Sequence, residues 1–226
     1  RPDSFIKNKS VYEYRKKLGA ELAKESHVEA DLIIPVPDSG VPASIGYAEK
    51  INKNIELGII RNHYVGRTFI EPTQQIRSLG VKLKHNINKS LVKNKSLILI
   101  DDSLVRGTTS VKIIKMLYEA GAKEVHLRIA SPPIKYPDYY GVDTPDKNEL
   151  IAAKLDVEGM RKFINAKTLK FLSIEGLYKS MGYEKRNPSY PQFTDHCFTG
   201  DYPVKPMDAS ENNFLDNDIS LMSSKY

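Results

Sequence analysis

The sequence contains a single cysteine and no long apolar run. Because Cys197 stands alone among 226 residues, an intramolecular disulfide is impossible, and an intracellular protein is the default expectation. No apolar stretch approaches the roughly 20 residues that a membrane-spanning helix needs, and no signal peptide is visible. These absences predict a cytoplasmic protein that has no membrane partner.

Basic residues outnumber acidic ones, but they do not form a patch. The 34 lysines and arginines against 28 aspartates and glutamates give a formal net charge of +6. Such a balance suits either nucleic acid or a polyanionic small substrate. Since the lysines are spread along the chain, we expect a small anionic substrate and no nucleic-acid partner. The length and the 40% content of hydrophobic residues fit one α/β domain with additional segments.

The most informative stretch is residues 97–110, Leu-Ile-Leu-Ile-Asp-Asp-Ser-Leu-Val-Arg-Gly-Thr-Thr-Ser. Its first four residues form an apolar run that is long enough for a buried parallel strand and too short for a helix. Asp101 and Asp102 follow the run, and Gly107 comes five residues later. A helical pattern with its apolar positions on one face comes next. The layout is a strand, an acidic pair, a loop rich in hydroxyls and a helix.

This layout indicates a phosphate site at the start of the helix. A helix N-terminus offers free N–H groups and the positive end of the helix dipole, and Gly107 lets the backbone approach an anion closely. Thr108, Thr109 and Ser110 add hydroxyl donors. Acids beside a phosphate would repel it, so we expect them to face ribose hydroxyls or a hard cation such as Mg²⁺. The alternative is a surface turn with a solvated acid pair and ordinary capping residues.

A second strand–turn–helix unit precedes this one. Residues 32–36 predict a strand, residues 37–40 a turn that carries Asp38 and Ser39, and residues 42–51 a helix. The turn should emerge at the carboxyl end of a parallel sheet, where ligands bind in doubly wound folds. Taken by itself, the segment also fits a plain turn.

Residues 61–77 mix arginines, aromatics, glycine and proline and have no clean period. A long irregular segment inside a compact domain is usually a lid or a binding loop. Arg61 and Arg67 could close over a polyanionic group from above, and Lys82 and Lys84 extend the basic character. A solvated loop with scattered charge is the alternative.

The rest of the sequence predicts further helices and strands, as expected for an α/β fold. Capping boxes at 10–13 and 146–149 predict two helix starts, the first helix ending near residue 25. Short strands are expected over 56–60 and 125–130, and helices over 156–165 and 173–181. We expect five apolar side chains of the last two helices to point inward: Met160, Phe163, Ile164, Leu177 and Met181. Periodicity is then lost, which divides the chain into a domain over 1–182 and an irregular, partly packed tail over 183–226.

The 97–110 stretch resembles the signature of the type I phosphoribosyltransferases, which bind phosphoribosyl pyrophosphate (PRPP). The resemblance implies an α/β fold with a mostly parallel twisted sheet flanked by helices, a flexible lid and an irregular C-terminal tail. In that family the two acids meet the ribose hydroxyls, the following loop cradles the 5′-phosphate, and the earlier turn holds the pyrophosphate and its metal.

Carried over by position, the resemblance implies three sets of site residues. Asp101, Asp102 and Arg67 would be catalytic, and Ser39 would join the two acids in holding Mg²⁺. The substrate-binding set would be Asp38, Ser39, Gly40, Arg61, Lys82, Lys84, Ser103, Val105, Arg106, Gly107, Thr108, Thr109 and Ser110.

Two motifs narrow the resemblance to the glutamine PRPP amidotransferases. They are Tyr-Val-Gly-Arg-Thr-Phe-Ile-x-Pro-x-Gln at 64–74 and Ile-Asp-Asp-Ser-x-Val-Arg-Gly-Thr-Thr-Ser at 100–110, and the similarity runs over essentially residues 1–181. It implies transfer of an amino group from ammonia to PRPP, giving 5-phosphoribosylamine and pyrophosphate at the start of purine biosynthesis. It further implies inhibition by purine nucleotides and a homo-oligomer.

The chain departs from this family in two ways. Full-length members carry an N-terminal glutaminase domain whose first residue is a catalytic cysteine, whereas this chain starts at Arg1, so we expect the synthase half alone, using free ammonia. One branch holds a [4Fe–4S] cluster. Cys197 matches one ligand position of that branch, but Asp138 stands where another cysteine would be expected. Since one thiolate cannot hold a cluster, we expect none.

Two other functions remain open on the residues alone. A PRPP-sensing regulator would keep the binding loop without catalysis, but no DNA-binding segment is evident and the lid segment is retained. A nucleobase phosphoribosyltransferase would need an aromatic stacking site near residues 125–145, where Tyr136, Tyr139 and Tyr140 lie.

Overall fold

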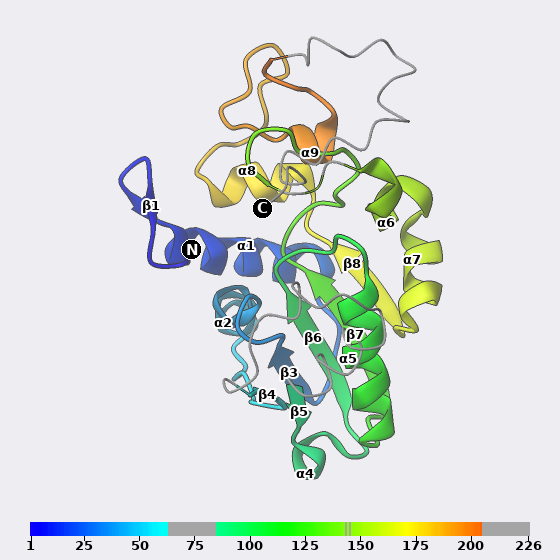
Figure 1. The fold of residues 1–226 in the computed structure, drawn as a ribbon. Helices are drawn as coiled ribbons and strands as arrows, with labels where there is room; N and C mark the ends of the chain where they lie inside the picture. The colour runs from blue at the N-terminus through cyan, green and yellow to red at the C-terminus, as the bar shows by residue number, and fades with distance from the viewer. Residues whose placement is uncertain (63–84, 143, 145, 205–226) are drawn as a thin grey trace.

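The computed structural model describes residues 1–62, 85–142, 144 and 146–204. Its centre is a parallel four-stranded sheet in the order β3-β6-β7-β8 (Figure 1). The strands are β3 (Leu32–Pro35), β6 (Ser96–Asp101), β7 (Glu124–Ile129) and β8 (Thr168–Phe171). The first three confirm strands that the sequence predicts. β8 was not predicted, because its four residues are half exposed and lie between two helical patterns.

Helices cover both faces of the sheet (Figure 1). One face carries α1 (Val11–Ser26), α2 (Val41–Lys50) and α8 (Ile174–Ser180), and the other carries α5 (Thr108–Glu119), α6 (Ile151–Lys154) and α7 (Val157–Ile164). Side chains alternate along β6, so Leu97 and Leu99 join the α5 core while Ile98 and Ile100 join the α1–α2 core. All four are fully buried, which is why this strand reads as a continuous apolar run.

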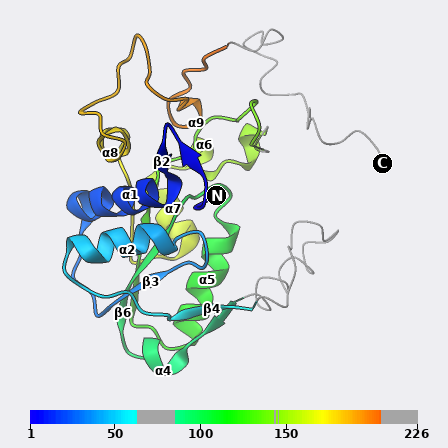
Figure 2. The same ribbon diagram turned by 90° about the vertical axis from the view of Figure 1, so that its left-hand side faces the viewer.

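Helices α1 and α2 touch backbone to backbone (Figure 2). A Cβ atom added to Gly19 would lie 1.8 Å from the carbonyl oxygen of Ala43, and one added to Gly46 would lie 1.8 Å from that of Lys16. No side chain fits either position, so both glycines are required for this close approach. The contact fixes α1 against the helix that follows the 37–40 turn.

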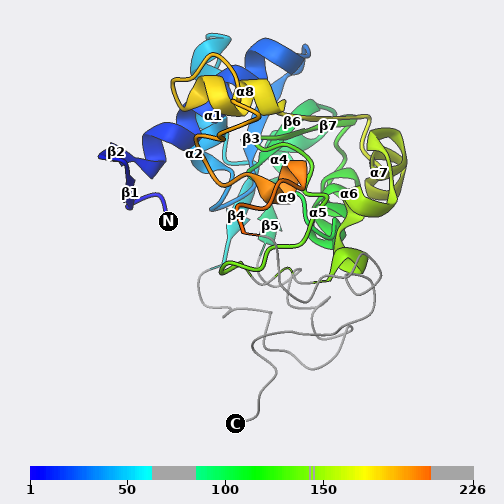
Figure 3. The ribbon, with the colours of Figure 1, turned by 90° about the horizontal axis from the view of Figure 1, so that it is seen from above.

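Smaller elements surround the sheet. They are the hairpin of β1 (Phe5–Ile6) and β2 (Lys9–Ser10), the antiparallel pair of β4 (Ile59–Arg61) and β5 (His85–Ile87), helix α4 (Lys89–Val92), the 3₁₀ helix η2 (Lys147–Glu149) and α9 (His196–Thr199). Figures 1 and 3 show α8 and α9 at the edge of the sheet where the carboxyl ends of β6 and β7 lie. Within the described residues, no helix is long and apolar enough to cross a membrane.

The strand predicted over 56–60 is wrong in its bounds. Ile55 still forms a parallel bridge to Ile33, but the N–H of Gly58 then donates to the carbonyl of Glu56 at 2.9 Å. This turn takes the chain out of the parallel sheet and into the separate antiparallel pair that begins at Ile59. The irregular sequence of 55–58 carries no alternation that would have located the turn.

Three finer predictions also need correction. Ser10 precedes α1, yet its side chain makes no capping hydrogen bond. Asp146 does accept from the N–H of Asn148 at 2.7 Å, but it opens a 3₁₀ turn, and α6 begins only at Ile151. Phe163 was expected inside and is 51% exposed, because its ring lies against Gly107 instead of entering the core. Met160 and Ile164, on the same helix, are buried as predicted.

Candidate functional site

The two acids of the 97–110 stretch lie at the carboxyl end of β6, near the middle of the sheet. Asp101 ends the strand and is 8% exposed. Asp102 is half-buried, and its backbone N–H donates to Asp101 Oδ1 at 2.9 Å. The hydroxyl of Ser103 donates to Asp102 Oδ1 at 3.1 Å. Local hydrogen bonds therefore orient both carboxylates.

The 37–40 turn, which follows β3, reaches this acid pair. The hydroxyl of Ser39 donates to Asp101 Oδ1 at 3.0 Å. Gly40 approaches β6 so closely that an added Cβ atom would lie 2.3 Å from the carbonyl oxygen of Ile100. The structure thus brings together the two loops that the sequence singled out, at one edge of the parallel sheet.

Arg15 is a residue of this site that the sequence analysis missed. Its Nη1 atom lies 3.2 Å from Asp102 Oδ2 and 3.3 Å from the carbonyl oxygen of Ser39. A signal was present, because Arg15 occupies the same helix face as Leu18 and Leu22, where a charged side chain interrupts an apolar stripe. Periodicity alone could not tell which acid it would meet.

Asp101 has an unusual proton affinity. Burial and then the negative charge of Asp102 raise the pKa of the Asp101 carboxyl from 3.8 to about 7, although the hydrogen bonds from Asp102 N–H and Ser39 Oγ oppose the shift. Near neutral pH a substantial fraction of Asp101 therefore carries a proton. Such a raised pKa is typical of adjacent carboxyl groups in functional sites.

The loop after the acids forms the start of α5. Gly107 is the N-cap residue and has φ of +75°, a left-handed conformation that favours glycine. Thr108 and Thr109 are exposed at the first turn of the helix, whereas Ser110 is buried. The arrangement leaves free helix N–H groups and two accessible hydroxyls a few residues from the acid pair, as an anion site requires.

Two loop residues of the predicted substrate set contact the protein itself. The carbonyl oxygen of Val105 accepts from the N–H of Ile151 at 2.9 Å. Arg106 is exposed and forms an ion pair with Glu149, in which Nε lies 3.0 Å from Oε2. These contacts tie the loop to η2 and α6, and they leave the Arg106 guanidinium group bonded to a carboxylate.

The remaining basic residues of the prediction divide into two groups. Arg61, at the end of β4, forms an ion pair with Asp38 of the turn, which follows Pro37 through a cis peptide bond. Arg67, Lys82 and Lys84 lie outside the described residues, as does nearly all of the lid segment that was predicted over 61–77.

A cavity of about 190 Å³ adjoins the acid pair. Its apolar walls come from α1, α2, the end of β7, α8 and α9: Leu18, Ala43, Ala130, Leu177 and Phe198. Arg15, Ser39, Asp102 and Ser131 supply polar groups. A small neutral molecule in this cavity would therefore lie beside the Asp102 carboxylate, against largely apolar walls.

The oxygen atoms at the acid pair suit a hard cation. Mg²⁺ prefers carboxylate oxygens and waters, and it is usually held by one or two carboxylates together with substrate phosphates. Asp101, Asp102 and Ser39 offer that donor set. Within the described residues, no group of three or more His, Cys, Asp or Glu side chains is placed to hold a metal by itself. This donor set therefore fits a cation that is shared with a substrate.

The single cysteine lies outside this site. Burial, and then the charge of Asp138, raise the pKa of the Cys197 thiol to about 11, so the thiol stays protonated. The neighbouring His196 is buried, and its Nε2 atom lies 2.8 Å from Asp138 Oδ2. Asp138, which stands at an expected cysteine position, here forms a hydrogen bond that ties residues 183–204, the C-terminal segment, to the rest of the chain.

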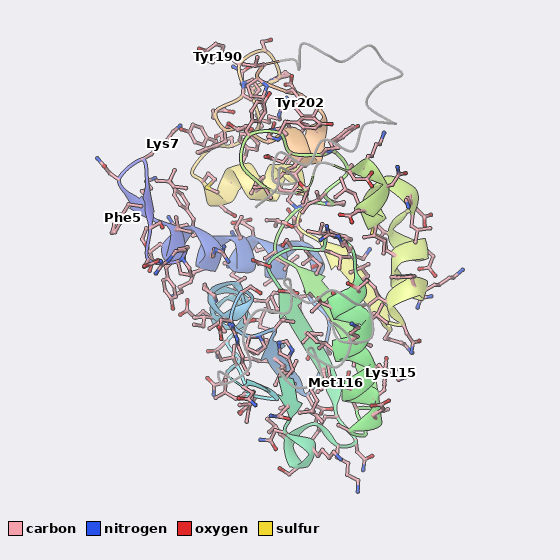
Figure 4. The ribbon with its side chains drawn as sticks, in the orientation of Figure 1. Phe5, Lys7, Lys115, Met116, Tyr190 and Tyr202 are labelled. Atoms are coloured by element: carbon pink, nitrogen blue, oxygen red, sulfur yellow. The ribbon has the colours of Figure 1, made fainter. Side chains whose placement is uncertain are left out.

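The tyrosines of the 125–145 region are engaged within the protein. The ring centroids of Tyr139 and Tyr202 lie 5.7 Å apart, and those of Tyr140 and His196 lie 5.0 Å apart (Tyr202 is labelled in Figure 4). Tyr136 lies against Gly200, where an added Cβ atom would be 2.9 Å from its ring. All three contact the C-terminal segment.

Comparisons with known proteins identify relatives of this chain. No known family profile matches the chain. An amidophosphoribosyltransferase of Rhizobium etli is 56% identical over 225 residues, which cover 99% of this chain and 45% of the relative. That of Bacillus subtilis is 50% identical over 91% of this chain and 43% of its own length.

Solved structures point the same way. The glutamine PRPP amidotransferase of B. subtilis in complex with ADP and GMP is 50% identical, with a TM-score of 0.81 over 92% of this chain and 46% of that one. A structure described as the allosteric regulatory enzyme of purine biosynthesis is 48% identical, with a TM-score of 0.78. The chain thus has the type I phosphoribosyltransferase fold. Nearly all of its length is homologous to amidophosphoribosyltransferases, and it spans somewhat less than half of the length of each of these relatives.

Proposed function

We propose that this chain is the phosphoribosyl-transfer part of an amidophosphoribosyltransferase. It joins ammonia to C1 of PRPP and releases pyrophosphate, giving 5-phosphoribosylamine. The observation that carries the proposal is the meeting of the Ser39 turn with the acid pair of Asp101 and Asp102, beside an open helix start, in a chain that is 50–56% identical to enzymes of that name.

Each group has a role that its position supports. Asp101 and Asp102 accept hydrogen bonds from the ribose hydroxyls. The backbone N–H groups and hydroxyls of residues 103–110 hold the 5′-phosphate at the start of α5. Asp38, Ser39 and Gly40 lie at the pyrophosphate, and Arg61, which pairs with Asp38, is proposed to exchange that carboxylate for a phosphate oxygen.

Charge development at C1 explains why these groups suffice. Departure of pyrophosphate leaves an oxocarbenium-like sugar, as in glycoside cleavage. Ammonia is itself nucleophilic, so positioning and the exclusion of water matter more than a strong general base. The cavity beside Asp102 is proposed to receive the ammonia, because its largely apolar walls disfavour the charged ammonium ion. Arg67, Lys82 and Lys84 are proposed to close over the leaving group.

Mg²⁺ is proposed as the metal, held by Asp101, Asp102 and Ser39 together with the substrate. When bound, it would neutralise charge on the departing pyrophosphate. Purine nucleotides are proposed as inhibitors at the same phosphate site, because the B. subtilis relative was solved with ADP and GMP. Supply of ammonia from glutamine, by a part of the protein that this chain does not include, and a homo-oligomer complete the proposal.

An assay of pyrophosphate release tests the proposal against its rivals. The 226-residue chain is incubated with PRPP and Mg²⁺, and with ammonium, adenine, guanine or no acceptor. Release that depends on ammonium supports the proposal. Dependence on a nucleobase would identify a nucleobase transferase, and binding of PRPP without turnover would identify a regulator. Omission of Mg²⁺ should abolish the ammonium-dependent release.

A further inference from the structure

A single guanidinium group connects three segments of the proposed site. Arg15, on α1, donates from Nη1 to Asp102 Oδ2 after β6 and to the carbonyl oxygen of Ser39 after β3. The Arg15 and Asp102 side chains are 28% and 32% exposed, so the pair lies at the wall of the cavity and not on the open surface. Its contacts therefore differ from those of an ordinary surface ion pair, whose geometry is loosely held.

The helix that carries Arg15 is held rigidly. Gly46 lets α2 meet α1 at the Lys16 backbone, and Gly19 lets the two helices meet again three residues further along α1. Glu25, near the far end of α1, accepts from Ser173 N–H at 2.9 Å. Figure 2 shows α1 lying along α2 for most of its length. A side chain that starts from a fixed helix can define the position of a carboxylate, whereas one on a mobile loop cannot.

The carboxylate of Asp102 must be held in one orientation to receive a substrate hydroxyl. Its Oδ1 atom accepts from the Ser103 hydroxyl and its Oδ2 atom from Arg15, which leaves each oxygen a further lone pair for a substrate hydroxyl. The positive charge of Arg15 also offsets the repulsion between the adjacent carboxylates. Without it, the Ser103 hydroxyl would be the one described side-chain donor left to orient the Asp102 carboxylate.

We propose that Arg15 is a positioning residue, which holds Asp102 and the Ser39 carbonyl in the arrangement that receives the ribose and pyrophosphate of PRPP. The inference rests on the proposed function and deepens it, because it names a residue that acts through the acid pair and the turn. Arg15 does so from an element that contributes no other group to the phosphate or ribose contacts proposed above.

The test compares three variants of the 226-residue chain. Arg15→Gln should lower PRPP affinity and the ammonia-dependent kcat/KM by about 10–100-fold, the usual cost of removing a group that orients a ligand-binding side chain. Arg15→Lys should recover only part of the loss, because an ammonium group lacks the planar fork that serves two acceptors. Lys17→Gln, an exposed charge loss two residues along the same helix, should change neither value by more than about twofold.

A double-mutant cycle separates positioning from a general structural role. PRPP binding is measured by calorimetry for Arg15→Gln in the native background and in Asp102→Asn. If Arg15 acts through Asp102, the loss in the second background should be several-fold smaller. Equal losses in both backgrounds, or full affinity in Arg15→Gln, would overturn the inference. If Arg15→Gln does not fold, Arg15→Lys serves in its place, with native-like unfolding and weakened PRPP binding expected.

The design also distinguishes this inference from the proposed function. No PRPP binding by the unsubstituted chain would overturn the proposed function, and the role of Arg15 with it. PRPP binding that survives Arg15→Gln unchanged would overturn the role of Arg15 and leave the proposed function standing.

Discussion

Ser39 Oγ lies 3.0 Å from Asp101 Oδ1, although 62 residues separate the two along the chain. The contact exists because β3 and β6 are parallel neighbours, so the turns after them leave the sheet at the same edge. Ser39 belongs to the 37–40 turn, which by its sequence alone also fits an ordinary surface turn. The hydrogen bond from Ser39 to the buried Asp101 places this turn in the site.

The acid pair should be essential to turnover and not to folding. Changing both Asp101 and Asp102 to asparagine preserves their size and removes their charge, so ammonia-dependent pyrophosphate release should fall at least about 100-fold. Circular dichroism should show an unchanged fold. Glu119→Gln, an exposed charge loss at the far end of α5, is the matched control. Unchanged turnover in the double variant would remove these residues from the mechanism.

The buried carboxyl of Asp101 should lower the free energy of unfolding as the pH rises. Its pKa is raised to about 7 in the folded chain from 3.8. The folded state therefore binds the proton more tightly, and its stability falls as the pH rises from about 4 to about 7 and is level above that range. Asp101→Asn avoids this cost, so it should be more stable than the native chain at pH 8, by on the order of 2–4 kcal/mol, and similar to it near pH 4.

Urea denaturation of the metal-free protein at several pH values measures this difference. Glu119→Gln removes an exposed carboxyl and keeps Asp101, so its stability should fall with rising pH in parallel with that of the native chain. A native chain that gains stability relative to Asp101→Asn between pH 4 and 7 would contradict the assignment. The stabilised variant should at the same time be inactive, because the protein retains a costly buried acid for its function.

The parts of the fold that could be predicted are those in which a short stretch of sequence determines the helix or strand by itself. Leu97–Ile100 are apolar on both faces of a parallel strand, so the run itself identifies a central strand. Gly107 and the hydroxyls after it identify a helix start, since glycine tolerates the left-handed conformation found there. Because the apolar run locates the strand, the prediction that the acid pair follows it is confirmed as well.

What escaped prediction depends on contacts between distant segments. Arg15 is a surface-type residue by composition, and only the crossing of α1 over the 37–40 turn makes it part of the site. Phe163 satisfies a helical pattern, but it lies against Gly107 and stays exposed. β8 has only four residues, too few to show a pattern in the sequence, and it is a strand because it pairs in parallel with β7.

The close approach of α1 to α2 should be necessary for both stability and binding. In Gly19→Ala the new methyl group would lie 1.8 Å from the Ala43 carbonyl oxygen, so the helices must separate. We expect a loss of about 3 kcal/mol or more in the free energy of unfolding, since backbone atoms cannot move aside as side chains do. PRPP affinity should fall as well, because Arg15 would move with α1.

Lys17→Ala, on the solvent side of the same helix, is the control for this variant and should change the free energy of unfolding by less than about 0.5 kcal/mol. Denaturation and calorimetry with PRPP provide the two readouts. A stable Gly19→Ala protein would show that the helices are not held at this distance.

Phe198 should determine how well the site excludes water. It is a wall of the cavity beside Asp102, although it comes from the C-terminal segment, where sequence periodicity is lost. Phe198→Ala would open that wall, so water should compete with ammonia for the sugar. We expect pyrophosphate release without ammonia to rise several-fold relative to release with it, and hydroxylamine or methylamine to become better acceptors relative to ammonia.

Phe193→Ala provides the matched control, because that ring belongs to the same segment but contacts Tyr178, Tyr183 and Lys7. Both variants remove a phenyl ring from residues 183–204, so a general loosening of the segment would raise hydrolysis in both. A rise confined to Phe198→Ala locates the water barrier at the cavity. Equal rises would instead assign the effect to the segment as a whole, and Phe198 would have no specific part in acceptor choice.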